Sequence, residues 1–308
     1  MENKKVVFGP VLSRRLGYSL GIDILPSKTC NLDCVYCEVC KTTNLTDERF
    51  RFVDFDQVIN EISEVSHEID YITITGSGEP TLHLDLNILI AKLKKNFNYP
   101  IVLITNSLLL RKKSVRKELE NLDIIMPSLD AVSQDVFEAV NKPVKGIMIT
   151  DVINGLIDFR KTYRGNIWLE ILFCKGINDG INEIKKMKGI IKKINPDKIQ
   201  LNTVARPPAY TNTGPLSFSE LQTIADLLDN QKVEIIISKP SNRKGEPLTE
   251  IELINYLRRR PANFEEINLC FGEQTDITRT MLLDLQKSKK IEKYTYNNEV
   301  FFKVCVFD

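Results

Sequence analysis

The sequence lacks long apolar runs and a strong charge of either sign. No stretch approaches the roughly 18 consecutive apolar residues that a membrane-spanning helix needs, and residues 1–5 are not followed by the apolar core of a secretory signal. The 42 Lys and Arg nearly balance 41 Asp and Glu, so no overall field attracts nucleic acid or an acidic membrane. With 308 residues, 43% of them hydrophobic, the chain can bury a large core. We therefore expect a globular cytoplasmic protein with no membrane partner.

A disulfide framework is also missing. The chain has seven cysteines, an odd number, and four of them lie between Cys30 and Cys40. The other three, Cys174, Cys270 and Cys305, are far from these and from one another, so they lack the close spacing of an auxiliary cluster. In a reducing cytosol, a tight group of cysteines is more typical of metal binding or catalysis than of cross-linking.

Short β-branched runs alternate with segments that carry apolar residues at helical spacing. Six βα units in succession predict a parallel sheet with covering helices, and they fit either a partial barrel or an open doubly wound sheet. The expected strands are 20–25, 71–75, 101–105, 124–128, 167–173 and 198–202, and the expected helices are 55–66, 84–95, 133–139, 149–163 and 182–194.

The pattern changes near the C-terminus. A helix over 217–229 and a strand over 233–237 precede a polar stretch, 239–247, that is typical of a linker. Three helices and two strands around a hairpin turn then resemble a winged helix, so we predict a barrel domain over 1–240 and a winged-helix-like domain over 246–308. The expected elements of the second domain are helices 249–259, 263–270 and 276–289 and strands 291–296 and 300–304 around Asn297-Asn298.

The cysteine-rich loop carries the strongest chemical signal. Cys30, Cys34 and Cys37 form a Cys-x3-Cys-x2-Cys pattern shortly after the first expected strand. Three thiolates on one short loop can bind an iron–sulfur cube, whose irons take thiolate ligands. Three protein ligands for four irons leave one iron open to substrate or cosubstrate, whereas structural sites use a full set. An open iron implies catalysis.

Two other interpretations of this loop remain. Zinc would recruit Cys40 as a fourth sulfur, although these spacings do not form the usual paired knuckles. The thiols are alternatively incidental. As a fourth ligand Cys40 would close an iron–sulfur cluster, so we interpret it as a non-ligand.

The cysteine pattern, with the aromatic Tyr36 just before the third cysteine, resembles the signature of the radical S-adenosylmethionine (SAM) superfamily. The resemblance implies a [4Fe-4S] cluster on Cys30, Cys34 and Cys37, SAM on the open iron, and an α/β fold built as a partial (β/α)6 barrel. In that family the ring at the position of Tyr36 packs near the adenine of SAM. Packing within the loop is the alternative role.

A second element follows the second expected strand, where residues 75–80 read Thr-Gly-Ser-Gly-Glu-Pro. Glycines allow a close backbone approach to a ligand, and Glu79 supplies an acceptor for an ammonium group. The segment resembles the superfamily's Gly-Gly-Glu-Pro element, which binds the amino group of SAM, with one glycine replaced by serine in either alignment. The SAM contacts implied here are Gly76, Ser77, Gly78, Glu79 and Pro80.

Polar residues at later strand ends resemble the family's contacts to the ribose and carboxylate of SAM. Thr105 and Asn106 end the third expected strand, and Ser128 and Asp130 follow the fourth. The ends of parallel strands are where α/β folds collect ligands. Ser128 and Asp130 have an alternative role as caps of the helix that begins near Ser133.

Three more polar residues lie on the later strands. Glu170 lies in an apolar strand, where a lone carboxylate is costly unless paired, and we expect it to face the barrel interior. Asn202 and Arg206, around the sixth strand, are candidates for holding SAM or substrate, with a solvated loop as the alternative for Arg206. For His83 we expect a structural or surface role.

Residues 8–210 as a whole resemble one superfamily branch, the iron–sulfur oxidoreductases related to tRNA wyosine-base synthases. The resemblance rests on residues 8–17, on Lys28-Thr29-Cys30, and on residues 176–179 and 206–208. The chain has no lysine-bearing extra cysteine motif that would carry over wyosine chemistry itself.

By this resemblance, a reduced cluster would cleave SAM to methionine and a 5′-deoxyadenosyl radical, with a reductant such as flavodoxin or ferredoxin. The protein must then supply a dry, oriented pocket rather than an acid–base pair, so the presence of only two histidines is no obstacle. The substrate is open: a tRNA base or small molecule, or a polypeptide if the chain is an activase or peptide maturase.

A third hypothesis is an iron–sulfur redox sensor that binds DNA through the winged helix. Residues 246–308 hold 9 Lys and Arg against 11 Asp and Glu, whereas a duplex-binding domain should be basic. This hypothesis also leaves residues 76–80 unexplained. We therefore favour packing or substrate presentation for this domain, with RNA recognised by shape as a further option.

Overall fold

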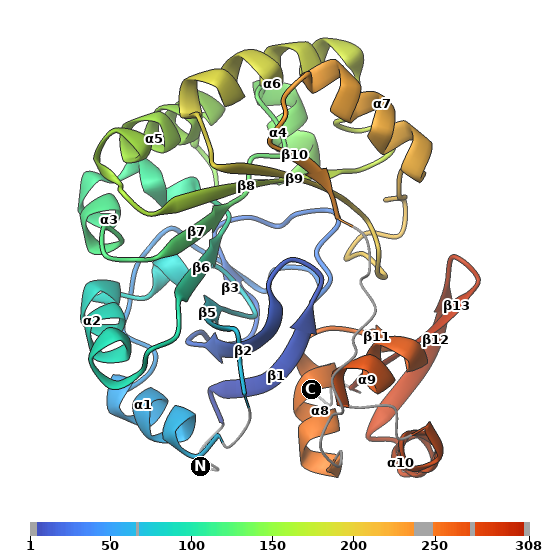
Figure 1. The fold of residues 1–308 in the computed structure, drawn as a ribbon. Coiled ribbons are helices and arrows are strands. Elements are labelled where there is room, and N and C mark those ends of the chain that lie inside the picture. The colour runs from blue at the N-terminus through green and yellow to red at the C-terminus, as the bar shows by residue number, and fades with distance from the viewer. Residues whose placement is uncertain (1–4, 66–67, 237–248, 272–274, 305–308) are drawn as a thin grey trace.

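The computed structural model describes residues 5–65, 68–236, 249–271 and 275–304. Its main feature is one eight-stranded sheet in the order β1-β2-β5-β6-β7-β8-β9-β10, which curves into an open arc (Figure 1). Strands β2 to β10 run parallel and β1 is antiparallel to β2. The strands are β1 (Val7–Ser13), β2 (Gly17–Asp23), β5 (Tyr71–Thr75), β6 (Ile101–Thr105), β7 (Ile124–Pro127), β8 (Asn166–Phe173), β9 (Lys198–Thr203) and β10 (Val233–Ile235).

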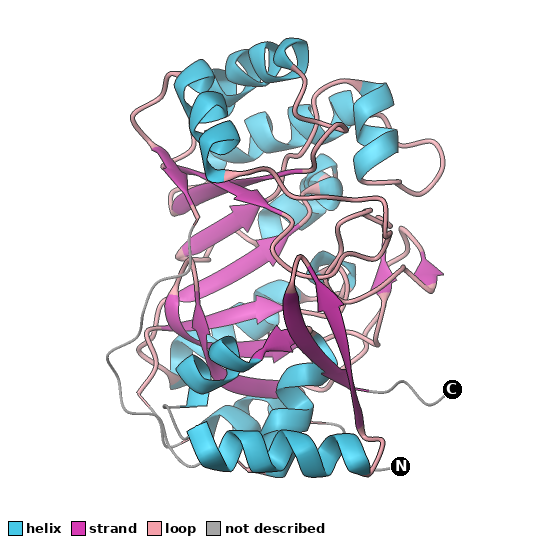
Figure 2. Cartoon of the chain, turned by 90° about the vertical axis from the view of Figure 1, so that its right-hand side faces the viewer, coloured by secondary structure: helices cyan, strands magenta, loops and turns pink. Residues whose placement is uncertain are grey.

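Helices cover the outer side of this arc, and Figure 2 shows the same sheet from the side. A doubly wound sheet would carry helices on both faces, so the predicted partial barrel is confirmed. The helices are α1 (Phe55–Ser63), α2 (Leu86–Asn96), α3 (Lys113–Glu118), α4 (Gln134–Val140), α5 (Ile149–Thr162), α6 (Ile181–Ile194) and α7 (Phe218–Leu228).

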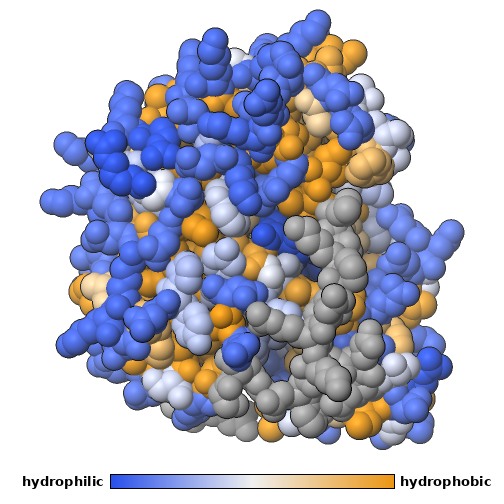
Figure 3. Space-filling model, viewed as in Figure 1, coloured by the Kyte–Doolittle hydropathy of each residue, from blue (hydrophilic) through white to orange (hydrophobic). Residues whose placement is uncertain are grey.

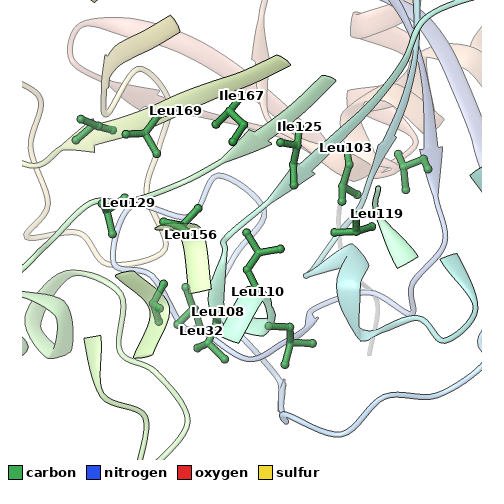
Figure 4. Packing of buried hydrophobic residues seen from close by; sticks show 14 of the residues in the cluster. Leu32, Leu103, Leu108, Leu110, Leu119, Ile125, Leu129, Leu156, Ile167 and Leu169 are labelled. Carbon is green, nitrogen blue, oxygen red and sulfur yellow. The ribbon is translucent and has the colours of Figure 1, made fainter. Parts of the chain in front are cut away.

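The outer face of the sheet is apolar because side chains alternate along each strand and this face meets the helices. Leu103, Ile125, Ile167 and Leu169 point from β6, β7 and β8 toward the helical layer, where Leu156 of α5 packs (Figure 4). All five side chains are fully buried. Their burial fixes which residues of each strand face inward.

The inner face changes character along the strands. Leu16, Val102, Ile124 and Met126 form a small apolar cluster inside the arc. Elsewhere on the inner face, buried polar side chains take the place of apolar ones, among them Ser19, Thr73, Glu170, Gln200 and Asn202. Because buried polar groups are costly unless they are hydrogen-bonded, this polar interior is a candidate ligand site.

Strand β1 and helix α3 were not predicted from the sequence. The Gly9-Pro10 pair inside β1 is typical of a turn, but the strand accommodates it through a register shift between Phe8 and Val11. Helix α3 has only six residues and four of them are charged, so its apolar periodicity is weak. All six strands predicted for the barrel are present within a few residues of their predicted bounds.

The C-terminal residues form a separate small core, as the change of pattern predicts. It contains Leu253, Leu257, Ile267, Leu282 and Ile291, and it packs against Val11 and Leu12 of β1. The elements are α8 (Glu250–Arg259), β11 (Ala262–Asn263), α9 (Phe264–Phe271), α10 (Thr275–Lys287), β12 (Ile291–Tyr296) and β13 (Glu299–Val304), with the strand order β11-β13-β12.

The predicted hairpin turn is present, since Asn297 and Asn298 have φ of 48° and 64°, as a two-residue type I′ turn requires. The predicted linker 239–247 lies outside the described residues. The winged-helix assignment and the boundary between the two domains stay predictions.

The surface seen in Figure 3 carries hydrophilic side chains along its outer rim, with hydrophobic surface between them nearer the centre. Within the described ranges, no helix has the length and apolar character to cross a membrane.

Candidate functional site

The cysteine loop follows β2 and lies at the C-terminal edge of the sheet. Its backbone is fixed there because Val35 N donates to Val140 O at 2.9 Å and Asp33 N donates to Asn141 O at 3.0 Å. A two-stranded ribbon of β3 (Thr29–Cys30) and β4 (Asn44–Leu45) closes the loop. The thiols of Cys30, Cys34 and Cys37 are half-buried, whereas Cys40 is exposed.

Each of the three half-buried cysteine sulfurs accepts a hydrogen bond from a different nitrogen donor. Asn106 Nδ2 donates to Cys30 Sγ at 3.6 Å, and Asn141 Nδ2 donates to Cys34 Sγ at 3.3 Å. Lys28 Nζ donates to Cys37 Sγ at 3.2 Å. Hydrogen bonds to the sulfurs are among the main protein controls on an iron–sulfur cluster.

Lys28 shows that the loop suits a negatively charged group. Its side chain is 4% exposed. Within the described residues, its ammonium group donates one hydrogen bond, to Cys37. Burial acts to lower the pKa of Lys28, but the neighbouring Cys37 outweighs it, so the pKa is raised. A buried ammonium is costly without a nearby anion, and thiolates bound to a cluster supply one.

A cluster and a single metal ion require different arrangements of the three cysteines. Among the described residues, no three His, Cys, Asp or Glu side chains converge as one ion requires. A cube instead binds each thiolate through a separate iron, so its sulfurs need not meet at one point. Burial raises the pKa of Cys30 to about 12 and that of Cys34 well above the usual value, so metal binding must displace their protons.

The turn over residues 76–80 packs directly on the cysteine loop. Lys28 N donates to Ser77 O at 2.9 Å, and Glu79 N donates to Thr29 O at 3.2 Å. A Cβ on Gly78 would lie 1.8 Å from Thr29 O, so only glycine fits at this position. The two motifs that the resemblance singled out therefore form one surface.

Glu79 lies at the centre of that surface and is 2% exposed. Its Oε1 accepts from Thr81 N at 3.0 Å, Thr81 Oγ1 at 2.5 Å and Thr105 Oγ1 at 2.6 Å, and its Oε2 accepts from Asn106 N at 2.7 Å. Burial raises the pKa of this carboxyl group. Thr105 and Asn106 thus hold Glu79 in place, and Pro80 begins the short 3-10 helix η1 (Pro80–Leu82) that Glu79 caps.

Asp130 joins the cysteine loop to the far side of the sheet. Its Oδ2 accepts from Tyr36 Oη at 2.5 Å and Asn141 Nδ2 at 2.8 Å, while Oδ1 accepts from Leu172 N at 2.9 Å. Burial raises the pKa of Asp130 to about 6. These contacts fix the Tyr36 ring, and the alternative that Asp130 caps the following helix is wrong, because the N-cap of α4 is Ser133.

Ser128 and Asn202 lie at neighbouring points of the inner face. Ser128 follows β7, where its carbonyl accepts from Ser107 Oγ at 2.6 Å, and it forms a β-bridge with Glu170. Asn202 Nδ2 donates to Glu170 Oε1 at 3.0 Å, and Arg15 pairs with the other oxygen of that carboxylate. Glu170 is therefore paired, as its apolar strand demands.

Arg206 is not solvated, so the alternative of a solvated loop residue is wrong. Its side chain is 3% exposed, and Nη1 contacts Glu38 Oε2 at 2.8 Å while Nη2 contacts Glu266 Oε1 at 2.5 Å. Glu38 is next to Cys37 in the chain, and Glu266 belongs to α9. Arg206 therefore joins the cysteine loop to the C-terminal module rather than facing solvent, and its role as a candidate for holding SAM or substrate stays a prediction.

His83 has a structural role. Its Nε2 lies 3.2 Å from Phe52 N and 3.3 Å from Val53 N and accepts from both. Burial lowers the pKa of His83, which favours the neutral ring that such acceptance requires.

The donors Lys28 and Asn141 and the ion-pair residue Glu38 were not predicted from the sequence. Lys28 stands inside the Lys-Thr-Cys approach that carried the family resemblance, so a signal for it was present. Glu38 follows the third cysteine directly. Asn141 lies more than 100 residues from Cys34, and only the fold brings the two together.

Comparisons with known proteins agree with this geometry. The radical SAM superfamily matches residues 24–187. A protein of Brachyspira hyodysenteriae named GTPase Obg is 36% identical over 98% of this chain but only 45% of its own length, so this chain spans less than half of that relative. The UPF0026 protein MJ1312 of Methanocaldococcus jannaschii is 30% identical over 96% of this chain and 95% of its own length.

Among solved structures, SuiB of Streptococcus suis bound to S-adenosylmethionine has a TM-score of 0.55 at 14% identity, covering 77% of this chain and 56% of that one. That likeness shows a shared fold. The relation to wyosine-base synthases stays a prediction. Because the superfamily match spans more than half of the chain and a relative is similar over nearly its full length, this protein belongs to the radical SAM superfamily, within the UPF0026 family, and is an enzyme of the kind that binds a [4Fe-4S] cluster and SAM.

Proposed function

We propose that this enzyme removes a hydrogen atom from a small molecule, or from a single exposed base of tRNA, that lies in a cavity beside the cysteine loop. The observation that carries the proposal is the joint surface of three sulfurs, each with its own nitrogen donor, and the Glu79 turn packed against them. When bound, the reduced cluster supplies the electron that splits SAM into methionine and a 5′-deoxyadenosyl radical.

The chain's own residues supply orientation and shielding. We assign Cys30, Cys34 and Cys37 to the cluster and Glu79 to the amino group of SAM, since its Oε2 accepts a single described hydrogen bond and retains a free lone pair. Tyr36, held by Asp130, is placed to flank the adenine. The further SAM contacts that we propose are Gly76, Ser77, Gly78, Pro80, Thr105, Asn106, Ser128, Asp130 and Asn202.

The cavity favours a small substrate. It has a volume of about 200 Å³ and lies between the barrel interior, the cysteine loop and α8, with Thr73, Gly76, Val39 and Tyr256 among its lining residues. Typical ligand pockets measure roughly 300–1,000 Å³, so this cavity suits a small molecule or one base better than a polypeptide segment. A protein-directed activase or maturase is therefore the second candidate, and a DNA-binding redox sensor is disfavoured.

The test is anaerobic reconstitution followed by an assay for 5′-deoxyadenosine with dithionite as reductant. We expect cleavage of SAM without added substrate, and its loss in Cys34→Ala. Cys40→Ala is the matched control, because Cys40 is exposed and we interpret it as a non-ligand. Unchanged turnover in Cys34→Ala, or absence of cleavage in the wild type, would refute the proposal.

Two further measurements address the substrate and the reductant. Mass spectrometry of tRNA nucleosides from a deletion strain tests the RNA option, and an unaltered profile counts against it. A cytoplasmic flavodoxin or ferredoxin is the proposed electron donor, which should replace dithionite in the same assay.

A further inference from the structure

Arginines crowd the side of the cavity formed by the cysteine loop and the C-terminal module. Arg15, Arg259 and Arg260 line the cavity together with Glu38. Arg206 and Arg14 lie behind Glu38, at 2.8 Å and 4.0 Å from its carboxylate oxygens. Burying so many guanidinium groups close together is costly unless negative charge is supplied nearby.

Three of these arginines have close carboxylate partners in the described structure. Arg15 pairs with Glu170, Arg206 with Glu38 and Glu266, and Arg259 Nε lies 3.7 Å from Asp23 Oδ2. These contacts account for four carboxylates around the cavity.

Arg260 is left without such a partner. It follows α8, and its Nη2 donates to Tyr256 Oη at 2.8 Å, with its guanidinium 5.0 Å from the centre of the Tyr256 ring. Within the described ranges, no carboxylate lies within 4.0 Å of this guanidinium. A phenol hydroxyl satisfies one of its five N–H donors and none of its charge.

Arg14 is only weakly paired. Its nearest carboxylate oxygen, Glu38 Oε1, lies 4.0 Å away and already accepts from Arg206 Nη1 at 2.9 Å. Burial and the neighbouring Arg206 lower the pKa of Arg14. Burial alone would raise the pKa of Glu38, but Arg206, Arg14 and Arg260 hold it at about 2. Glu38 and Glu266 are thus two carboxylates among three guanidinium groups, Arg206, Arg14 and Arg260, so one positive charge is in excess.

We propose that Arg260 and Arg14 bind an oxyanionic group of the substrate, a carboxylate or a phosphate, at the Glu38 end of the cavity. Arginine suits this role because its planar fork matches both groups and stays charged when buried. The inference rests on the proposed function, since it takes this cavity as the place where the substrate lies. It predicts that the substrate carries an anionic group, which would lie next to Glu38, the residue after Cys37.

The experiment measures anion binding directly. The full chain, reconstituted anaerobically and saturated with SAM, is titrated with pyrophosphate and with malonate by calorimetry at low salt. We expect one of the two anions to bind, and binding to weaken at least tenfold in Arg260→Gln and in Arg14→Gln, because each loses a charge-assisted contact. Tighter binding of pyrophosphate indicates a phosphate, and tighter binding of malonate indicates a carboxylate.

The matched control is Arg258→Gln. Arg258 is exposed in the last turn of α8, two residues before Arg260, and donates to Asn255 Oδ1 at 3.2 Å, so its loss changes the net charge equally without touching the cavity. Neither anion binding to the wild type, or equal binding by all three variants, would overturn the inference. If Arg260→Gln fails to fold, Arg14→Gln, in the turn between β1 and β2, tests the inference.

The outcome is separable from that of the proposed function. Substrate-free cleavage of SAM is measured on the same wild-type preparation. Cleavage without anion binding rejects the oxyanion site alone, whereas anion binding without cleavage rejects the proposed radical chemistry alone.

Discussion

Replacing Lys28 by methionine should lower the reduction potential of the cluster. Methionine keeps most of the length of the side chain but removes the ammonium group that donates to Cys37 Sγ at 3.2 Å. Reduction adds a negative charge to the cluster, and a nearby cation stabilises the reduced form more than the oxidised one. Because Lys28 is 4% exposed, solvent screens this effect little.

Two routes bracket the magnitude. A unit charge at an effective separation of about 5 Å and an effective dielectric constant of about 20 is worth roughly 3 kcal/mol, which corresponds to roughly 140 mV for one electron. A hydrogen bond to a charged group is worth about 1.5–3 kcal/mol, and if about 1 kcal/mol of it differs between the redox states the shift is about 40 mV. We therefore expect a decrease of about 40–140 mV.

The assay is a redox titration of the reconstituted protein followed by electron paramagnetic resonance. Lys142→Met is the matched control, because Lys142 is an exposed lysine on the same side of the protein that contacts only the Tyr210 ring in the described cation–π pairs. Lys28→Arg should retain most of the wild-type potential. If Lys28→Met and Lys142→Met give the same potential within about 20 mV, the assigned role of the buried charge is wrong.

Two other substitutions test the packing of the site. In Gly78→Ala the new Cβ would lie 1.8 Å from Thr29 O. The iron content after reconstitution should therefore fall below half of the wild-type value, and the affinity for SAM, measured by equilibrium dialysis, should fall at least tenfold. The control is Gly180→Ala, whose new methyl group would have no atom within 4 Å and which should behave as wild type. Arg206→Met removes the hydrogen-bonded cation between Glu38 and Glu266 and should cost about 2–4 kcal/mol in urea unfolding. Loss of the exposed Lys188–Asp229 pair in Lys188→Met should cost at most about 1 kcal/mol. Equal midpoints for the last two variants would contradict the importance of the Arg206 ion pairs.

The fold and the centre of the site were predictable because both depend on short-range patterns. Alternating apolar runs indicated the six parallel strands. The cysteine spacing and residues 76–80 identified two segments of the site, which pack against each other in the structure. Gly78 illustrates why the second motif was recognisable, since its steric requirement excludes every other residue.

The remaining residues of the site depend on contacts between distant parts of the chain. Asn141 lies 107 residues from Cys34, and Arg206 lies 168 residues from Glu38. A sequence pattern cannot show that an arginine in a polar loop is buried between two carboxylates from distant segments. Glu170 is intermediate: its apolar strand predicted that it needs a partner, but only the structure identifies Arg15 and Asn202.

The contact between β1 and the C-terminal core has a consequence for biosynthesis. Strand β1 is an edge strand, and Val11 and Leu12 pack against a core built from residues 253–291. A ribosome makes β1 more than 200 residues before those partners, so the nascent barrel presents this apolar edge while the rest is being translated. Ribosome-bound chains that stop before α8 should therefore recruit chaperones at β1, and the chaperones should dissociate once the C-terminal core has emerged from the ribosome.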